Sequence, residues 1–354
     1  MADELKKHRE RIDALDDEIL KLISERATHA QAIGQLKNGL VYRPEREAQV
    51  LTRIKKNNPG PLTEETIARL FREVMSACLA LEKPLSVAYL GPAGTFSQAA
   101  AIKHFGHAAK TNAYSSIDEV FRAVEAGAAD YGVAPVENST EGSVNRTLDL
   151  MLASALKICG EVELRIHHHL LRKHAGMADV QKIYSHAQSF AQCHAWLNQN
   201  LKNVARLQVG SNAEAARLAA QDENAAAIAG ETAAEIYGLV KLAENIEDEP
   251  NNTTRFLVIG AHDAAPSGKD KTSLVMSAQN RPGAVHDLLS PLSKYGVSMT
   301  KFESRPARTG AWEYVFYVDL EGHQQEENIA KALQDLKGSA AYLKILGSYP
   351  VAVL

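Results

Sequence analysis

The residue with the clearest chemical meaning is Arg26, which stands where an apolar side chain is expected. From Leu5 to Leu36, one register of the sequence advances in alternating steps of three and four residues, and most of its members are apolar. This pattern is typical of one face of a long helix that packs against another helix. A guanidinium on such a face is costly to bury unless an anion meets it. Arg26 therefore indicates either a buried ion pair or a pocket for an anionic ligand.

Two further cations on the same helix differ in their phase relative to Arg26. Lys37 follows it by 11 residues, about three helical turns, so both side chains face the same side. Arg9 precedes Arg26 by 17 residues, which places it roughly 25 Å away and rotated by about 100°. Arg9 cannot serve the same pocket from its own chain, but in an antiparallel dimer it would reach the pocket of the partner.

The next two predicted helices add polar side chains to this set. Arg46 and Glu47 open one helix, and Cys78 and Glu82 share a face of the other. A pocket that contains several cations and one glutamate, but no nucleophile or metal cluster, is suited to bind a small ligand with two negative charges. Such a pocket can accelerate a unimolecular rearrangement by holding a reactive conformer and stabilising developing charge.

The middle of the chain carries four hydroxyl-rich turns at predicted helix starts. A single turn of this kind is usually a helix cap, but four in one domain, at the carboxyl ends of strands, predict a cleft for an anion. The segment "PNNTTRF" adds polar side chains and an arginine before an apolar strand, and by itself is equally typical of a polar turn. The four turns are "GPAGTFS" (91–97), "ENSTEGS" (137–143), "SHAQS" (185–189) and "GSNAE" (210–214).

The helices that position the first set fill residues 3–83. The first is expected to end near Asn38, the second to begin after Pro44, and the third to begin at Thr63. A helix of ~35 residues spans ~50 Å, which is longer than its two partners can cover. Its overhang predicts an interlocked homodimer.

Two more domains follow the boundary at Lys83-Pro84. Short apolar strands alternate with helices up to residue 260, which predicts a mainly parallel α/β sheet in two lobes with a cleft between them. The remaining residues give the order βαββαβ, the ferredoxin-like plan. We therefore expect an all-α dimer domain at 1–84, a two-lobed α/β domain at 85–265 and an α+β domain at 271–354.

Composition excludes several classes of protein and site. The net charge of −4 argues against nucleic acid as a partner, and no apolar run approaches the ~18 residues of a membrane span. The three cysteines are far apart, so neither a disulfide nor a zinc site is indicated. The run of three histidines at 167–169 is not expected to bind a metal, because adjacent strand residues face opposite sides. We expect a soluble cytoplasmic protein without a cofactor.

The first domain resembles the all-helical chorismate mutases through "RERIDALDDEIL", "SERATHAQAIGQLK", "VYRPERE" and "RLFREVMSACLALE". The resemblance implies that a group of cations binds chorismate and that Glu47 contacts the substrate hydroxyl. The implied cations are Arg26, Lys37, Arg46 and, from the partner chain, Arg9.

Three positions of this domain depart from the family pattern. Cys78 matches a serine of some relatives, Glu82 stands where glutamine is frequent, and Arg43 stands where aspartate is frequent, so the role of Arg43 stays open. A carboxyl donates a hydrogen bond to the ether oxygen of chorismate only when it is protonated. Mutase activity is therefore predicted to fall as the pH rises and Glu82 loses its proton.

The second domain resembles prephenate dehydratase through "GPAGTFS", "PVENSTEGSV", "SHAQSFAQC" and "NNTTRFLVIG". The resemblance implies a fold like that of periplasmic binding proteins, with prephenate in the cleft. Thr254 matches the essential threonine of the family, which assists protonation of the leaving hydroxyl or orients it, and Arg255 and Phe256 complete its motif. The other implied pocket residues are Thr95, Asn138, Ser139, His186 and Ser211.

The third domain resembles the amino-acid-binding ACT domain through "NRPGAVHDLL" and "ESRP". The resemblance implies a site for L-phenylalanine and feedback inhibition, a coupling between distinct sites. The implied site residues are Gly283, Ala284, Val285, Glu303, Ser304, Arg305 and Pro306.

A non-enzymatic amino-acid sensor is the competing interpretation. In that case the cleft only binds, the last domain senses, and the first helices only dimerise. The arginine on the helical seam speaks against it, because a dimerisation helix has no need of a buried cation.

Overall fold

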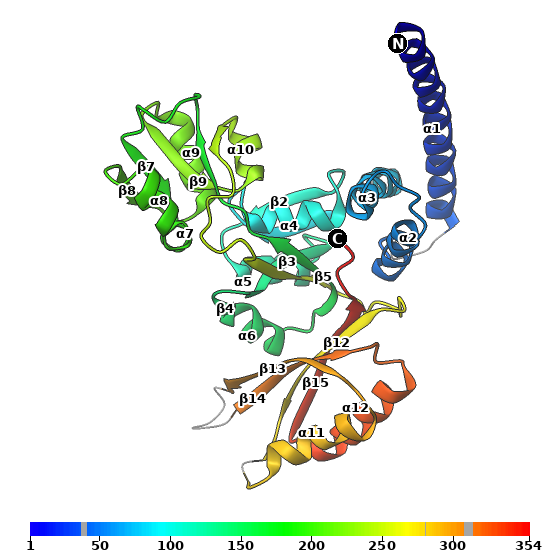
Figure 1. Cartoon of the computed structure of the whole chain (residues 1–354). Coiled ribbons are helices and arrows are strands. Elements are labelled where there is room, and N and C mark those ends of the chain that lie inside the picture. Colours follow the sequence, from blue (N-terminus) through cyan, green and yellow to red (C-terminus); the bar gives the residue numbers. More distant parts are fainter. Residues whose placement is uncertain (37–40, 280, 308–313) are drawn as a thin grey trace.

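The computed structural model describes residues 1–36, 41–279, 281–307 and 314–354. These residues form three domains (Figure 1). The predicted fold class is confirmed: a helical domain, a two-lobed domain and a C-terminal domain follow one another along the chain. Lys37, which the sequence analysis assigned to the anion pocket, lies outside the described residues. No helix among the described residues is long and apolar enough to cross a membrane.

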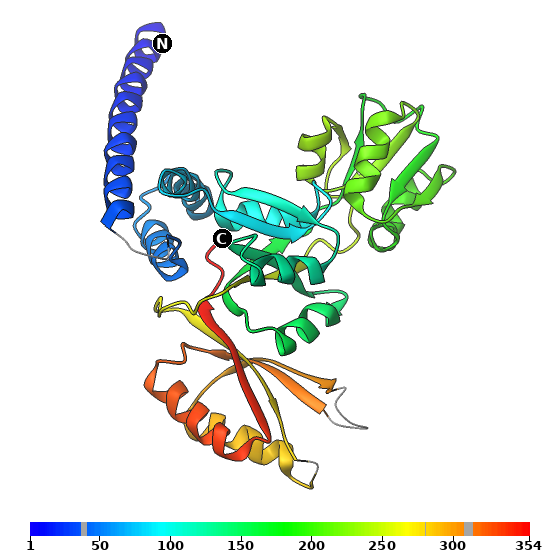
Figure 2. The same cartoon turned by 180° about the vertical axis from the view of Figure 1, so that it is seen from behind.

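The helical domain consists of α1 (Ala2–Leu36), α2 (Pro44–Lys56) and α3 (Glu64–Ala80). Pro44 occupies the first turn of α2, where its missing N–H costs nothing, and the Thr63 side chain caps α3 by accepting from the Thr66 amide. α2 and α3 pack on each other, whereas α1 meets them only near its C-terminal end and otherwise projects away from the molecule (Figures 1 and 2).

The first lobe of the two-lobed domain is built on one mixed sheet in the order β2-β1-β3-β11-β5, with β4 paired to β3. β2 and β3 are parallel to β1, but β11 is antiparallel to both β3 and β5. Its elements are β1 (Ser86–Leu90), α4 (Phe96–Phe105), β2 (Lys110–Tyr114), α5 (Ile117–Glu125), β3 (Tyr131–Asn138), β4 (Gly142–Ser143), α6 (Asn145–Ala153), β5 (Lys157–Arg165) and β11 (Thr253–Gly260).

The second lobe carries a sheet in the order β10-β6-β9-β7-β8. Only β7 pairs in parallel, with β8 and β9, whereas β6 is antiparallel to β9 and β10. The expectation of mainly parallel sheets was therefore wrong, because the chain passes between the lobes through antiparallel strands. The elements are β6 (His169–Arg172), β7 (Lys182–Ser185), α7 (Ala187–Gln192), α8 (His194–Asn200), β8 (Ala205–Gln208), α9 (Asn212–Gln221), β9 (Ala225–Ala229), α10 (Glu231–Tyr237) and β10 (Val240–Ala243).

The C-terminal domain has the predicted βαββαβ order and an antiparallel sheet in the order β13-β14-β12-β15. α11 and α12 cover one face of this sheet (Figure 1). The opposite face joins the core of the first lobe, where Tyr317 and Tyr349 are buried among residues of α5 and α6. The elements are β12 (Asp270–Ser277), α11 (Ala284–Lys294), β13 (Met299–Pro306), β14 (Tyr314–Glu321), α12 (Glu327–Ser339) and β15 (Tyr342–Pro350).

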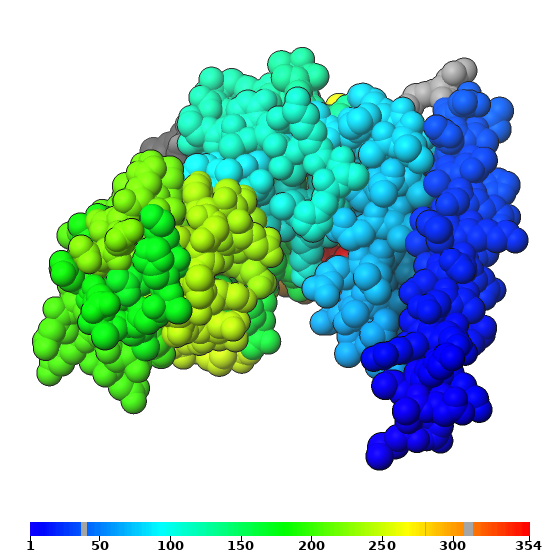
Figure 3. Space-filling view, turned by 90° about the horizontal axis from the view of Figure 1, so that it is seen from above, coloured from blue at the N-terminus to red at the C-terminus, as the bar shows by residue number. Residues whose placement is uncertain are grey.

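The last residues of the described chain return to the helical domain. The Lys55 ammonium donates to the Val353 carbonyl at 2.9 Å, and Val353 and Leu354 pack against Leu51 and Met75. All three domains therefore meet at one junction around α2, α3 and α4. The helical domain and the second lobe lie on opposite sides of the first lobe, and the surface between them is hollowed (Figure 3).

Candidate active sites

The apolar seam of α1 is not covered by its own chain. No residue of this helix is buried, and Leu15, Ile19 and Leu22 all count among the exposed large apolar side chains. A row of leucines and isoleucines over many turns is unfavourable in water. The homodimer stays a prediction, but the seam has the surface that such a dimer would bury.

Arg26 and Glu82 each hold a buried polar atom without a partner. Nη1 of Arg26 and Oε2 of Glu82 have no hydrogen-bond partner among the described residues. Glu82 lies directly against Gly34 of α1, where an added Cβ would stand 2.5 Å from its Cγ. Unpaired buried charges are expensive, so these atoms indicate a place where a polar ligand binds.

Glu47 forms an ion pair with Arg72, a residue that the sequence analysis missed. Burial raises the pKa of the Glu47 carboxyl, while the charge of Arg72, hydrogen bonds from Arg72 and Tyr42, and the charge of Arg26 hold it down. Arg72 stands on the apolar stripe of α3 between Ala68 and Met75, and both flanking residues are buried. Arg72 could therefore have been found as Arg26 was, as a cation on an apolar helix face.

The remaining predicted members of this site are placed less closely together. Cys78 is buried on α3, whereas Arg46 and Arg9 are exposed on α2 and α1. Arg43 lies beside Glu45, with 3.9 Å between Nη1 and Oε1, and has no described contact with the other predicted site residues. Within one chain the charge of Arg26 acts on Glu47, and Glu82, which follows α3, contacts Gly34 of α1, whereas Arg9 lies near the other end of α1.

In the two-lobed domain, Thr254 and Asn138 face each other across a pair of antiparallel strands. The Asn138 amide nitrogen donates to the Thr254 hydroxyl at 2.8 Å and to the Asn252 side-chain oxygen at 2.7 Å. The Asn138 oxygen accepts from the backbone and hydroxyl of Thr140, which fixes the amide orientation. Because the Thr254 oxygen accepts, its own hydrogen stays available for a ligand.

Ser139 locks this arrangement from the neighbouring position. Its amide donates to the Thr253 carbonyl at 2.9 Å, and its hydroxyl accepts from the Thr253 amide at 3.0 Å. The loop after β3 is thereby tied to the start of β11, so Thr254 is held by two strands and one loop.

Three other predicted pocket residues cap helices, as their turns indicated. Thr95 accepts from the Gln98 amide, His186 from the Gln188 amide and Ser211 from the Glu214 amide. Thr95 belongs to the first lobe, and the other two belong to the second. A cavity of about 370 Å³ between the lobes includes Thr95 but not Thr254.

Arg255 and Phe256 do not join Thr254 in this structure, contrary to the expectation that they line the substrate pocket. The Arg255 side chain extends to the C-terminal domain, with Nη1 2.6 Å from the Asp319 carboxylate and Nη2 2.8 Å from the Tyr349 hydroxyl. Successive strand residues face opposite sides of a sheet, so an arginine next to Thr254 is directed away from it. Phe256 is 2% exposed in the core beneath α4.

The C-terminal domain holds a cavity of about 810 Å³ at the start of α11. Gly283, Ala284 and Val285 line it, as expected, and Gly283 caps the helix with a φ of +76° that favours glycine. The second predicted element is placed elsewhere, because none of residues 303–306 lines this cavity. Glu303 contacts the Ser143 hydroxyl, and Arg305 pairs with Asp149 at 2.9 Å.

None of the His, Cys, Asp and Glu side chains in the described ranges form a group that could hold a metal ion. In the run of three histidines, Nδ1 of His167 contacts Glu247 at 2.7 Å and Nε2 of His168 contacts Gln192 at 2.8 Å.

Comparison with known proteins covers all three domains. The family model of type II chorismate mutase matches residues 8–83, that of prephenate dehydratase residues 87–264, and that of the ACT domain residues 272–338. A bifunctional chorismate mutase/prephenate dehydratase of Neisseria gonorrhoeae is 62% identical over 351 residues, which span 98% of this chain and 97% of the relative.

Solved structures match the second and third domains. The prephenate dehydratase of Arthrobacter aurescens in complex with L-Phe has a TM-score of 0.69 and 32% identity, and the match covers 75% of this chain and 90% of that one. The quorum-quenching acylase GqqA has a TM-score of 0.70 and 29% identity, over 75% of this chain and 98% of its own. A shared fold thus accompanies different chemistry, and the reaction must be argued from the site.

Proposed function

Since this chain belongs to the family of bifunctional chorismate mutase/prephenate dehydratases and has both activities, we propose that it makes phenylpyruvate from chorismate under feedback control by phenylalanine. Prephenate is the product of the first reaction and the substrate of the second. The three domains then correspond to the mutase at 1–84, the dehydratase at 85–265 and the ACT domain at 271–354.

In the mutase, Arg26 would bind one carboxylate of chorismate, with Lys37, Arg46 and Arg9 of a second copy completing the set of cations. The observation that supports this best is the buried Arg26 Nη1 without a partner. Glu47 would accept from the substrate hydroxyl, and Glu82 would donate to the ether oxygen, while Cys78 lines the pocket. The rearrangement needs no proton transfer, so its rate depends on holding the reactive conformer and stabilising charge.

In the dehydratase, Thr254 would donate a hydrogen bond to the hydroxyl that leaves from prephenate. The observation that carries this part is the Asn138–Thr254 bond, in which the threonine oxygen accepts and its hydrogen is left for the substrate. Ser139 fixes the loop beside it, and the helix starts at Thr95, His186 and Ser211 would attract the substrate carboxylates as the lobes close. Expulsion of hydroxide and carbon dioxide then produces the aromatic ring.

Phenylalanine would bind in the 810 Å³ cavity at Gly283, Ala284 and Val285. The residues of β13 would transmit this event, because Glu303 and Arg305 contact the dehydratase domain through Ser143 and Asp149. Ser304 and Pro306 lie on the same strand. Regulation would follow if the two domains repack when the cavity is filled.

We also propose that the enzyme is a cytoplasmic homodimer. The uncovered seam of α1 supports the dimer. The three free, buried cysteines suit a reducing compartment.

One assay tests the proposal. The purified protein is given chorismate, and prephenate and phenylpyruvate are followed over time, with and without phenylalanine. We expect both products in that order and a slower second step when phenylalanine is present. Recovery of unchanged chorismate would support the non-enzymatic sensor, and isothermal titration without phenylalanine binding would remove the regulatory part.

A further inference from the structure

Tyr42 connects the mutase domain to the core of the dehydratase domain. It precedes α2, yet its side chain is buried among the aromatic residues of the first lobe. Its ring lies 5.2 Å from that of Phe105 and 5.1 Å from that of Tyr131, measured between centroids. Five residues before Glu47, the chain is thus anchored in the neighbouring domain.

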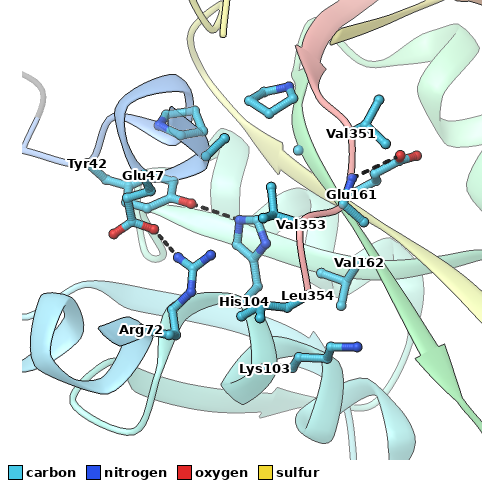
Figure 4. A pocket seen from close by; sticks show the side chains of 15 residues that line it. Tyr42, Glu47, Arg72, Lys103, His104, Glu161, Val162, Val351, Val353 and Leu354 are labelled. Carbon is cyan, nitrogen blue, oxygen red and sulfur yellow. Dashed lines mark hydrogen bonds and ion pairs between the residues drawn. The ribbon is translucent and has the colours of Figure 1, made fainter. Parts of the chain in front are cut away.

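The hydroxyl of Tyr42 lies between a dehydratase histidine and the mutase glutamate. Its oxygen is 2.8 Å from Nε2 of His104, which stands on α4 (Figure 4). The guanidinium of Arg72 donates to the Glu47 carboxyl, and the Tyr42 hydroxyl lines the same small pocket and helps to lower the pKa of Glu47. Glu47 is therefore oriented from two sides, by α3 of its own domain and by α4 of the next.

An ionised Glu47 fits one set of hydrogen-bond directions along this chain of groups. Pairing with Arg72 favours an ionised Glu47, and a carboxylate only accepts hydrogen bonds. The one hydroxyl hydrogen of Tyr42 is then donated to Glu47, so the Tyr42 oxygen accepts from His104. Burial and the charge of Arg72 hold the pKa of His104 well below its usual range, so the ring is neutral, and in this set of directions its hydrogen is on Nε2.

We propose that His104, a residue of the dehydratase domain, is a positioning residue for the mutase reaction and holds Glu47 in place through Tyr42. This inference rests on the proposed role of Glu47 in the mutase site. A carboxylate that must meet one substrate hydroxyl loses rate when it is free to rotate, because the arrangement is no longer fixed before the reaction. The mutase site is thus completed by the domain that consumes its product.

The close approach of α3 and α4 supports a fixed relation between the domains. Gly106 ends α4 with a φ of +74°, and an added Cβ there would stand 2.4 Å from the Cβ of Ser76. Glu73 of α3 also contacts Nδ1 of His107 at 2.9 Å. His104 and Arg72 are therefore held on packed helices.

The experiment uses the full-length protein and measures both activities of each variant. His104→Phe keeps the ring volume and removes the hydrogen bond, and His104→Gln offers a polar atom near the position of Nε2. We expect His104→Phe to lower the mutase kcat about tenfold with a change in KM below about twofold, the size expected for one lost hydrogen bond. His104→Gln should recover most of that loss.

Dehydratase activity on supplied prephenate is the internal control, and it should stay within about twofold of the parent protein. Tyr42→Phe should lower the mutase kcat at least as far as His104→Phe, and the double variant should be no slower than Tyr42→Phe alone, since both act through one contact. An unchanged mutase in His104→Phe, or equal loss of both activities, would overturn the inference.

Glu47→Gln separates this inference from the function on which it rests. Full mutase activity in Glu47→Gln would remove the proposed role of Glu47 and the inference with it. Loss of activity in Glu47→Gln, together with a normal His104→Phe, would overturn the inference alone.

Discussion

Arg255 donates a hydrogen bond to Asp319 at 2.6 Å, and this contact joins the strand that carries Thr254 to the ACT domain. The guanidinium also binds Glu161 at 2.7 Å, and both carboxylates are almost wholly buried. The neighbouring position on β11 is Thr254. A movement of β14 on ligand binding would therefore reach the dehydratase site through one side chain.

The first prediction concerns this contact. Asp319→Asn keeps the shape of the side chain and weakens the pair, so phenylalanine inhibition should require several-fold more phenylalanine while the uninhibited dehydratase rate changes little. The inhibition curve at fixed prephenate measures this effect. Asp335→Asn is the matched control, because Asp335 pairs with Lys294 at the exposed surface of the same domain. Equal inhibition curves for the parent and Asp319→Asn would show that the signal takes another route.

The second prediction concerns Thr254. Thr254→Ala removes the hydroxyl that Asn138 orients, so phenylpyruvate formation should fall by a factor of roughly 10²–10⁴, the range of an acid that assists a leaving group. Mutase activity should be unaffected. Thr253→Ala, whose hydroxyl donates to the Asn251 carbonyl, should lose far less. A Thr254→Ala enzyme that still makes phenylpyruvate at the parent rate would refute the assignment.

The third prediction concerns the partner's contribution to the mutase site. Arg9→Ala and Arg26→Ala should each abolish most mutase activity in a pure homodimer. After subunits of the two variants are mixed, unfolded and refolded together, half of the dimers are hybrids, and each hybrid has one intact site. Mutase activity should then return to about a quarter of the parent value. No recovery, with hybrids shown to form, would mean that both arginines serve the site of one chain.

The fourth prediction concerns pH. A carboxyl donates to the ether oxygen only in its protonated form, so mutase kcat should be lower at alkaline than at acid pH. Glu82→Gln always donates and should flatten the alkaline side of the profile. Glu73→Gln is the control, since Glu73 lies at the surface beside His107, on the helix that ends just before Glu82. A profile that Glu82→Gln leaves unchanged would exclude Glu82 as the donor.

Long periodic elements were predictable from the sequence, but several strands were not. The helices at 44–56 and 64–80 follow their caps and apolar stripes closely. β2 carries no apolar run that would predict it, because it lies at the edge of its sheet and none of its residues is buried. β5 was missed because polar residues such as Glu161 interrupt it and are satisfied by residues far away in the sequence, Arg255 and Lys271.

The candidate sites divide in the same way. Arg26 and Thr254 could be found from the sequence, because Arg26 interrupts an apolar helix face and Thr254 lies in a polar segment directly before an apolar strand. Tyr42 and His104 could not be found in this way, because their contact forms only when the two domains pack together. The direction of Arg255 was missed for a related reason: its partners belong to a domain that begins after the linker.

The burial of Tyr42 changes how the covalent boundary after residue 84 should be understood. A force that pulls on α2 would first be carried by the buried Tyr42 ring and by the contact between α3 and α4. The short linker at Lys83 would stretch only after these contacts had yielded. On the far side, Val353 and Leu354 would transmit force to α2 and α3. Under mechanical stress the junction should behave as one stiff body, beyond which α1 extends as a lever arm.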